Sequence, residues 1–195
     1  MLRTVSMNDK IDLRIVKTQK KLTDALFSMM SEMPFDDITV FDLCERANIR
    51  RATFYKHYND KYDFFKGVTL RLIENFANTL ISNDDTFTPS NYFTRFVNEV
   101  FVYFEKRPVI LSNLLESNTF PVMYDIITSC THSALVERLT ELKKSGMYIT
   151  TDITFTANFI NGGIAKIMLD WFKSPIVPKE ILLAKIDEIM AKVFA

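Results

Sequence analysis

Glycine, proline, cysteine and histidine are all scarce in this chain. Its 195 residues include four glycines and six prolines, against 17 phenylalanines and nine methionines. Turn-rich β folds depend on glycine and proline, so this composition favours an all-α fold. Two cysteines give no disulfide framework, and with only two histidines these residue types cannot assemble a metal-ligand cluster. We therefore expect no metal and no cofactor.

Long apolar runs and catalytic motifs are lacking as well. No stretch approaches the roughly 18 apolar residues of a membrane-spanning helix, and the start has no signal-peptide apolar region. The sequence contains no GxSxG, P-loop, dinucleotide-binding or HExxH motif. The low cysteine content fits a reducing cytosol. We therefore expect a cytoplasmic protein with no membrane partner and no enzymatic activity.

Positive charge is concentrated in two stretches, although the whole chain balances 24 basic against 24 acidic residues. Residues 13–23 contain four basic residues, Lys17 among them, and no acid. Residues 46–61 contain five basic residues and His57 against a single acid, Asp60. Phosphate recognition requires such a local patch rather than a net charge. Both stretches are therefore candidate contacts to a nucleic-acid backbone.

The first part of the chain carries start and stop signals for short helices. Apolar residues recur at helical spacing over residues 10–33, and Pro34 ends this predicted helix. Thr39 opens a second, shorter helix with a capping-box pattern that Asp42 completes. Asn48 follows where the chain must turn sharply, and asparagine tolerates the left-handed conformation that such a turn requires.

Two more helices follow this turn. A short helix is predicted over residues 49–57, and Asn59 or Asp60 caps a longer helix over residues 61–81. Two short helices that are joined by a tight turn and braced by longer helices form a helix-turn-helix.

The helix over residues 49–57 has a polar face suited to DNA. Arginine reads guanine edges, threonine contacts thymine methyls or phosphates, and tyrosine and lysine hold phosphates in the major groove. Thr39 and Lys61, each at the start of a helix, are placed to hold phosphates on either side. A solvated basic face is the alternative, and for His57 the alternative is a helix end cap. The predicted contacts on the helix itself are Arg50, Arg51, Thr53, Tyr55, Lys56 and His57.

One continuous segment resembles a known signature. Residues 38–65, ITVFDLCERANIRRATFYKHYNDKYDFF, resemble the DNA-binding signature of tetracycline-repressor (TetR) type transcriptional regulators. The resemblance is strong over residues 10–70, and residues 158–172, NFINGGIAKIMLDWF, are similar to the penultimate helix of the family's dimer interface. It implies an N-terminal three-helix DNA-binding domain and a larger helical C-terminal domain that dimerises and usually binds a small effector. By this resemblance the positions that commonly contact DNA are Thr39, Arg51, Thr53, Tyr55, His57 and Lys61.

Two residues depart from the family pattern. Glycine is usual where Asn48 stands, which is a mild change. A capping serine is usual where Arg50 stands, and arginine cannot accept the backbone N–H bonds that a cap accepts. Either the helix starts on weaker capping or Arg50 supplies a DNA contact of its own, and we favour the contact.

Turn-forming residues suggest how the chain is divided. The segment SNDDTFTPS, residues 82–90, is the strongest candidate for a boundary. We expect a flexible tail over residues 1–9, a DNA-binding domain over residues 10–70, and a helical effector-binding and dimerisation domain over residues 71–195. Breaks within the last part predict helices near residues 89–105, 108–117, 121–145, 150–173 and 178–194.

The last two predicted helices indicate a dimer. Gly162 and Gly163 lie inside a strong helical pattern, where each glycine costs about 1 kcal/mol relative to alanine. Glycine there favours the close approach of another helix, with a kink or tight intrachain packing as the alternative. A two-fold dimer would present two recognition helices one DNA turn apart, roughly 34–36 Å, to a near-palindromic operator. The predicted dimer contacts are Phe155, Phe159, Gly162, Gly163, Ile167, Trp171, Ile186 and Ile189.

Aromatic residues are abundant in the second half of the chain and either fill its core or line a cavity. Small-molecule sites are mostly apolar with a few oriented polar groups. No basic cluster lies among the candidate polar groups, so we expect a neutral, aromatic or cationic ligand. The predicted ligand contacts are Phe96, Tyr103, Asn113, Tyr124, Thr128 and Asn158, with Asn118 and Asn161 as further polar candidates.

The resulting prediction is a ligand-responsive repressor that binds a near-palindromic site on double-stranded DNA as a homodimer, with a small hydrophobic effector. The alternative is an activator or interaction protein that a partner protein controls, and an exposed apolar patch in place of a pocket would favour it. A helical enzyme with an N-terminal helix-turn-helix is a third class, and the absence of catalytic motifs argues against it.

Overall fold

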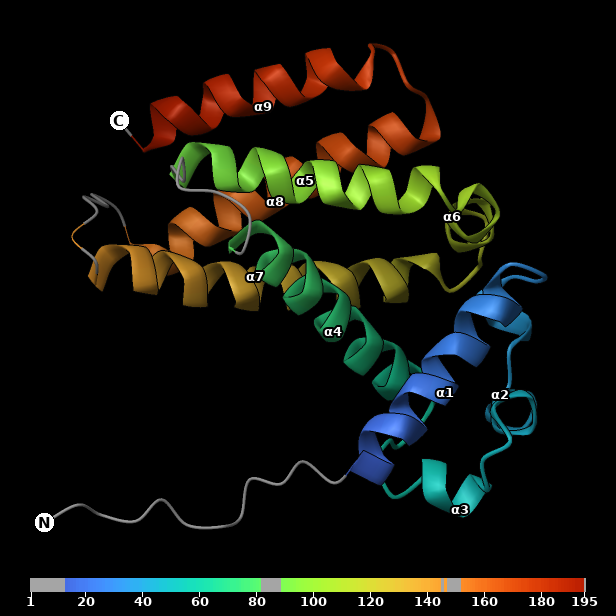
Figure 1. The fold of residues 1–195 in the computed structure, drawn as a ribbon. Helices are drawn as coiled ribbons and strands as arrows, with labels where there is room; N and C mark the ends of the chain where they lie inside the picture. Colours follow the sequence, from blue (N-terminus) through green and yellow to red (C-terminus); the bar gives the residue numbers. More distant parts are fainter. Residues whose placement is uncertain (1–12, 82–88, 145, 147–151, 195) are drawn as a thin grey trace, which may run out of the picture.

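The computed structural model describes residues 13–81, 89–144, 146 and 152–194, and every regular element in these ranges is a helix (Figure 1). The predicted all-α fold is therefore confirmed. The predicted tail over residues 1–9, and residues 82–88 of the predicted boundary, lie outside the described residues. The elements are α1 (Leu13–Met30), the 3-10 helix η1 (Phe35–Asp37), α2 (Val40–Ala47), α3 (Arg51–Phe54), α4 (Lys61–Ile81), α5 (Pro89–Glu105), α6 (Pro108–Leu115), α7 (Phe120–Lys144), α8 (Ile153–Lys173) and α9 (Lys179–Val193).

The helices form two groups that α4 joins (Figure 1). In the first group α1 packs on α2, and α2 on α3. In the second group α9 lies beside α5, and α7 lies beside α8. The start of α4 packs in the first group, and the rest of the helix packs along α7 and α5.

An aromatic core fixes α3 against the start of α4. The side chains of Phe54 and Phe64 are fully buried, with ring centroids 5.7 Å apart. The ring of Tyr58 packs between the two helices, 4.9 Å from Phe64. Because Phe54 and Tyr58 point inward, the opposite side of α3 and of the turn after it faces solvent.

The second group has its own core. Val97 and Phe101 of α5 are buried against Leu139 of α7 and Ile160 of α8. The Trp171 ring lies 4.8 Å from that of Phe101, in an edge-to-face arrangement.

The predicted helices of the second half match α5 to α9 to within three residues at each end. The prediction for residues 49–57 is wrong in length, because α3 spans only Arg51–Phe54 and residues 55–57 form a turn. The N–H groups of His57 and Tyr58 both donate to the Phe54 carbonyl, at 2.9 and 3.0 Å. This shared acceptor tightens the chain into a turn where the regular α pattern would have continued.

Candidate functional site

The turn between α2 and α3 has the backbone geometry that the sequence predicts. Asn48 adopts φ 51° and ψ 51°, and no other described non-glycine residue has a positive φ. Its N–H donates to the Glu45 carbonyl at 3.0 Å, and the Ile49 N–H donates to the Cys44 carbonyl at 2.9 Å. These bonds close the end of α2 and reverse the chain, so that α3 begins three residues after Asn48.

A side-chain cap starts α2. Thr39 Oγ1 accepts a hydrogen bond from the Asp42 N–H at 3.1 Å, as the capping pattern predicts. The reciprocal bond differs from the prediction, because Asp42 Oδ2 accepts from the Thr39 hydroxyl at 2.5 Å instead of from the backbone. The exposed Thr39 side chain is therefore held in one orientation at the start of α2.

Arg50 precedes α3 without capping it by a side-chain hydrogen bond. The helix thus starts on weak capping, which is one of the two readings that the sequence left open. The Arg50 side chain is exposed, and whether it also contacts DNA stays a prediction.

The predicted contact residues lie together around α3. Arg50, Arg51, Tyr55 and Lys56 are exposed, with 57% of Tyr55 accessible to solvent. Two further predicted contacts, Thr53 and His57, are half-buried, and Lys17 is exposed on α1. Figure 1 shows that α1 begins at the end of the molecule where α3 lies.

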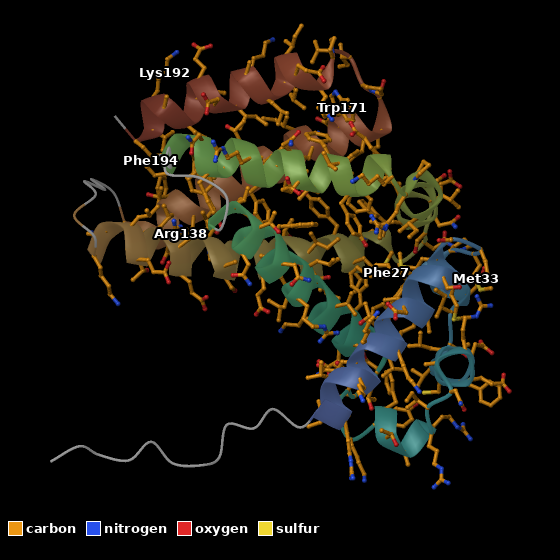
Figure 2. All side chains as sticks on the ribbon, in the orientation of Figure 1. Phe27, Met33, Arg138, Trp171, Lys192 and Phe194 are labelled. Carbon is orange, nitrogen blue, oxygen red and sulfur yellow. The ribbon has the colours of Figure 1, made fainter. Side chains whose placement is uncertain are left out.

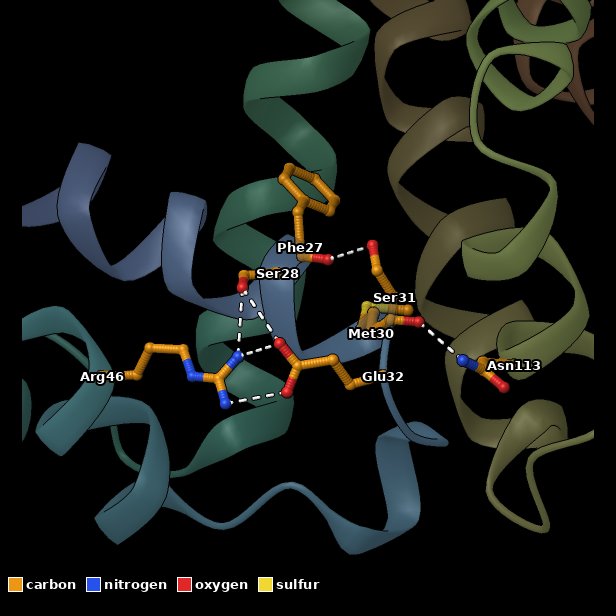
Figure 3. Close-up of polar contacts among 7 residues, drawn as sticks. All are labelled: Phe27, Ser28, Met30, Ser31, Glu32, Arg46 and Asn113. Carbon is orange, nitrogen blue, oxygen red and sulfur yellow. Dashed lines mark hydrogen bonds and ion pairs between the residues drawn. The ribbon is translucent and has the colours of Figure 1, made fainter.

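Arg46 belongs to the basic stretch but braces α2 against α1 (Figure 3). Its guanidinium makes a two-pronged ion pair with Glu32: Nη1 contacts Oε1, and Nη2 contacts Oε2 at 2.8 Å. Nη1 also donates to Ser28 Oγ at 3.0 Å. The hydrogen bond from Arg46 holds the pKa of Glu32 below its ordinary value. Arg46 therefore contributes to the helix pair rather than to the exposed basic face.

Lys61 is half-buried under η1, and its position differs from that of an open phosphate contact. Its ammonium group donates to three backbone carbonyls, those of Phe35, Asp36 and Ile38, at 3.0, 2.9 and 3.0 Å. Burial lowers the pKa of Lys61, while the charges of Asp36 and Asp37 act in the opposite direction. All three ammonium hydrogens are engaged within the protein, so Lys61 fixes the start of α4 to η1. A phosphate contact by its charge stays a prediction.

The junction between the two helix groups is held by polar contacts that the sequence did not reveal. Asp36 of η1 accepts from the backbone N–H groups of Asn118 and Thr119, at 2.7 and 3.1 Å. Burial raises the pKa of Asp36, but the hydrogen bonds from this loop outweigh it and the pKa lies below its ordinary value. Asn113 Nδ2 donates to the Met30 carbonyl at 2.8 Å, as Figure 3 shows. The α6–α7 segment is thus attached to the end of α1.

An aromatic contact lies at the same junction. Phe27, labelled on α1 in Figure 2, packs edge-on against Tyr103 of α5 with ring centroids 6.2 Å apart. Tyr103 in turn packs against Phe76 of α4 at 5.7 Å. Burial raises the pKa of the Tyr103 hydroxyl. Tyr103 therefore belongs to the packing between α1, α4 and α5.

A cavity of about 500 Å³ lies in the second helix group, with walls from α4, α5, α6, α7 and α8. Aromatic and aliphatic side chains make up most of its lining. The apolar lining includes Phe96 and Phe104 of α5, Leu111 and Leu115 of α6, Phe120 of α7, and Met168 and Phe172 of α8.

Two groups of polar side chains in the cavity wall have contacts that fix them in place. Asn161 of α8 accepts from the Thr131 hydroxyl at 2.7 Å and donates to the Thr128 carbonyl at 3.0 Å, which holds α8 to α7. Elsewhere Arg138 pairs with Glu141 at 3.1 Å and lies 5.1 Å from the Tyr92 ring centre. The charged residues of the lining are Glu74, Glu137, Arg138 and Glu141, three acids and one base.

Half of the predicted ligand contacts lie at this cavity. Phe96, Tyr124 and Thr128 line it. Tyr103 and Asn113 do not, because both face α1 across the junction, and Asn158 is exposed on the outer side of α8. We therefore correct the assignment of these three residues. The sequence did not predict that Arg138 and Glu141 line the cavity, because charged residues at this spacing are equally typical of a solvated helix surface.

Two aromatic side chains on the outer side of α8 are uncovered in the single chain. Phe155 and Phe159 are each 65% exposed, one helical turn apart. A Cβ added to Gly162 or Gly163 would meet nothing within 4 Å, which excludes tight intrachain packing as the reason for these glycines. Ile189 of α9 is also exposed.

Other predicted dimer contacts are buried or half-buried in the single chain. Ile186 is buried in the core, and Trp171 Nε1 donates to the Val177 carbonyl at 2.8 Å. Ile167 is half-buried. Ile186 is therefore a core residue rather than a dimer contact, whereas a dimer contact by the half-buried Trp171 stays a prediction.

Other chemistries find little support in the described part of the chain. No helix there is long and apolar enough to cross a membrane. The same residues contain no group of three or more His, Cys, Asp or Glu side chains that could hold a metal ion. Cys44 and Cys130 are buried, and burial raises the pKa of both thiols. Both therefore behave as small packing residues.

Comparison with known proteins identifies a matching family model and a relative of this chain. Residues 91–192, more than half of its length, match a family model described as a transcriptional regulator C-terminal region, TetR_C_8. The chain is also 36% identical over 63 residues to the uncharacterized HTH-type transcriptional regulator YxbF of Bacillus subtilis (strain 168). That match covers 32% of this chain but only 17% of YxbF.

Solved structures share the arrangement of helices. Lin0861 from Listeria innocua superposes with a TM-score of 0.68 at 22% identity, covering 98% of this chain and 96% of its own. A TetR transcriptional regulator from Rhodococcus sp. RHA1 superposes with a TM-score of 0.63 at 10% identity, covering 93% of this chain and 98% of its own. At such identities the similarity establishes the fold alone.

Proposed function

The chain belongs to the TetR family of transcriptional regulators, and on this premise we propose that it is a repressor which a small ligand releases from its operator. As a transcriptional regulator of this family it is not an enzyme. We further propose that it acts in the cytoplasm as a dimer on a near-palindromic site.

The observation that carries the proposal is the exposed basic surface around α3. Arg50, Arg51 and Lys56 make no ion pair within the described part of the chain, so their charges are available to DNA. The inward-facing Phe54 and Tyr58 anchor this segment from behind. An anchored helix start with uncompensated cations fits the major groove and the phosphates beside it.

We propose that α4 contains the boundary between a DNA-binding unit, residues 10–70, and an effector-binding and dimerisation unit, residues 71–195. Phe64, Phe65 and Val68 of α4 are buried in the first core, whereas Leu80 is buried in the second. The dimer would form through the outer side of α8, where Phe155, Phe159 and the two glycines are uncovered.

Replacing Arg51 with alanine is expected to weaken operator binding by about 1–3 kcal/mol, roughly 5- to 150-fold, and to relax preference at particular base pairs. The reason is that an arginine which reads a guanine edge makes two directed hydrogen bonds. The measurement is selection of bound sequences from a random DNA pool, followed by affinity titration of parent and variant on the selected site.

Lys192→Ala is the matched control for this experiment. Lys192 is an exposed cation at the far end of the molecule, as Figure 2 shows, so its loss should leave operator affinity within about twofold. If Arg51→Ala and Lys192→Ala both bound the selected site like the parent, the recognition surface would be assigned to the wrong place.

The cavity supports a small-molecule effector over control by a partner protein, because a pocket of about 500 Å³ is retained in the second helix group. Its lining contains three acids and one base, which favours a neutral, aromatic or cationic hydrophobic ligand. Phe96, Tyr124 and Thr128 are the ligand contacts that we retain, and Asn161 joins them.

Replacing Ala134 with phenylalanine is expected to abolish ligand binding, because Ala134 lines the cavity and a ring there would occupy the ligand's space. A ligand at one hundred times its Kd stabilises the parent by about 2.7 kcal/mol, which raises Tm by several degrees. The measurement is a screen of hydrophobic metabolites and drugs for this shift, repeated on Ala134→Phe.

Ser133→Phe is the control, since Ser133 precedes Ala134 on α7 but is exposed. It should keep the ligand-induced rise in Tm. Each hit is then added to the operator complex, where coupling of about 1–3 kcal/mol would weaken binding roughly 5- to 150-fold. Hits that stabilise the protein but leave operator affinity unchanged would contradict the release mechanism and direct attention to a partner protein.

A further inference from the structure

Phe41 is a large apolar residue on the DNA-facing side of the molecule, and it is not among the proposed DNA contacts. It is the second residue of α2, directly after the first helical position, and 52% of it is exposed. Phenylalanine is usually buried, and neighbouring residues of α2 such as Leu43 and Cys44 are. Packing in the core therefore does not explain why a phenylalanine stands at this position.

Arg51 is a charged neighbour of the Phe41 ring. The central carbon of the Arg51 guanidinium lies 5.5 Å from the ring centre, within the range of a cation–π contact. Phe41 is at the start of α2 and Arg51 at the start of α3, so the contact spans the turn at Asn48. Among the described residues no acid pairs with Arg51, and the ring is the group that restricts its guanidinium.

A free arginine side chain is flexible, and ordering it on a base edge costs conformational entropy. A ring that already holds the guanidinium lowers this cost, because fewer rotamers are lost when DNA binds. The planar guanidinium can stack on an aromatic face while its N–H groups point outward in the plane to accepting atoms.

We propose that Phe41 is a positioning residue which orients Arg51 toward the operator and sharpens discrimination between operator and other DNA. The proposal rests on the proposed function, because it assumes that Arg51 reads the operator. It differs from a direct contact of the Phe41 ring with DNA, for example with a thymine methyl.

The test compares Phe41→Leu, Phe41→Trp and Arg51→Ala with the double variant Phe41→Leu/Arg51→Ala, on the selected operator and on random DNA of equal length. Leucine keeps an apolar side chain but removes the π face, whereas tryptophan retains a stronger one. Phe41→Leu is expected to reduce operator affinity by about 2- to 30-fold, with binding to random DNA within about twofold of the parent. Phe41→Trp should bind like the parent, and in the Arg51→Ala background Phe41→Leu should have no further effect.

Two measurements keep the outcomes separate. The thermal midpoint of Phe41→Leu should match that of the parent, because the ring is exposed, and Ile176→Ala reports the effect of trimming an exposed apolar residue far from α2. If Arg51→Ala loses affinity but Phe41→Leu does not, the positioning role is overturned and the proposed DNA binding stands. If Phe41→Leu loses as much affinity in the Arg51→Ala background as alone, the ring acts on DNA directly and the positioning role is again overturned. If neither single variant changes binding, the recognition surface itself is misassigned.

Discussion

Glutamate at both Phe155 and Phe159 is expected to convert a dimer into a monomer and to weaken operator binding by at least about a hundredfold. Burying a phenylalanine contributes about 1.5–3 kcal/mol, and a two-fold interface would bury two such rings from each protomer. A carboxylate placed there would lose solvation without gaining a partner. A monomer occupies only one half-site and loses the gain from binding two linked half-sites. Light scattering at micromolar concentration measures the first effect, and operator titration the second.

Val122→Glu provides the control for this double variant. Val122 is an exposed apolar residue on α7, so its replacement tests whether glutamate on any apolar surface disturbs the protein. It should leave both the mass and the operator affinity unchanged. The dimer assignment would fail if the parent were already a monomer with and without DNA, or if the double variant remained a dimer.

Replacing Lys61 with methionine is expected to lower the free energy of unfolding by about 1–3 kcal/mol, because three carbonyls of the η1 region lose their shared donor. If the Lys61 charge also faces a phosphate, the slope of log affinity against log salt should fall by about one. Denaturant unfolding measures the first quantity, and operator titration from low to physiological salt the second.

Lys56→Met separates these two effects. Lys56 is exposed, so its replacement should lower the salt slope by about one without changing stability. A Lys61→Met variant that loses stability but keeps the parent's salt slope would limit Lys61 to its structural role. An unchanged free energy of unfolding would contradict the importance of the three carbonyl contacts.

Local signals in the sequence predicted the turns and caps of the first helix group well. The cap at Thr39, the left-handed turn at Asn48 and the cap at the start of α4 all depend on residues within a few positions of each other. Asp60 Oδ1 accepts from the N–H groups of Tyr62 and Asp63, as a helix cap should. Short-range geometry of this kind is encoded by residue type alone, so it can be read without the fold.

The second half shows why the site residues there were harder to predict. Helical spacing predicts that α8 carries apolar residues on its surface. It cannot predict which of these residues other helices of the same chain cover. Phe159 and Trp171 belong to the same helix and are both aromatic, yet Phe159 faces solvent and Trp171 packs on Phe101. The direction of each side chain depends on where α5 lies, and that is a property of the whole fold.

Asn113 illustrates the same limit across a longer distance. Its type and position suggested a polar group inside a ligand site, but its amide bonds to the carbonyl of Met30, 83 residues earlier in the chain. Contacts between such distant residues leave no periodic signal in a single sequence. The junction between the two helix groups therefore became visible only in the folded chain.

The attachment of Asp36 to the α6–α7 loop has a kinetic consequence. The amide hydrogen of Asn118 points at the Asp36 carboxylate, so it exchanges with solvent deuterium while that carboxylate has moved away. The Thr119 amide donates to Ser117 Oγ as well, at 3.1 Å, so it keeps a partner when Asp36 leaves. The exchange rate of the Asn118 amide therefore reports how often the contact between Asp36 and the loop opens. Leu115, three residues before Asn118, lines the cavity. Hydrogen exchange at Asn118 therefore measures the opening of a contact that connects the cavity wall to the first helix group.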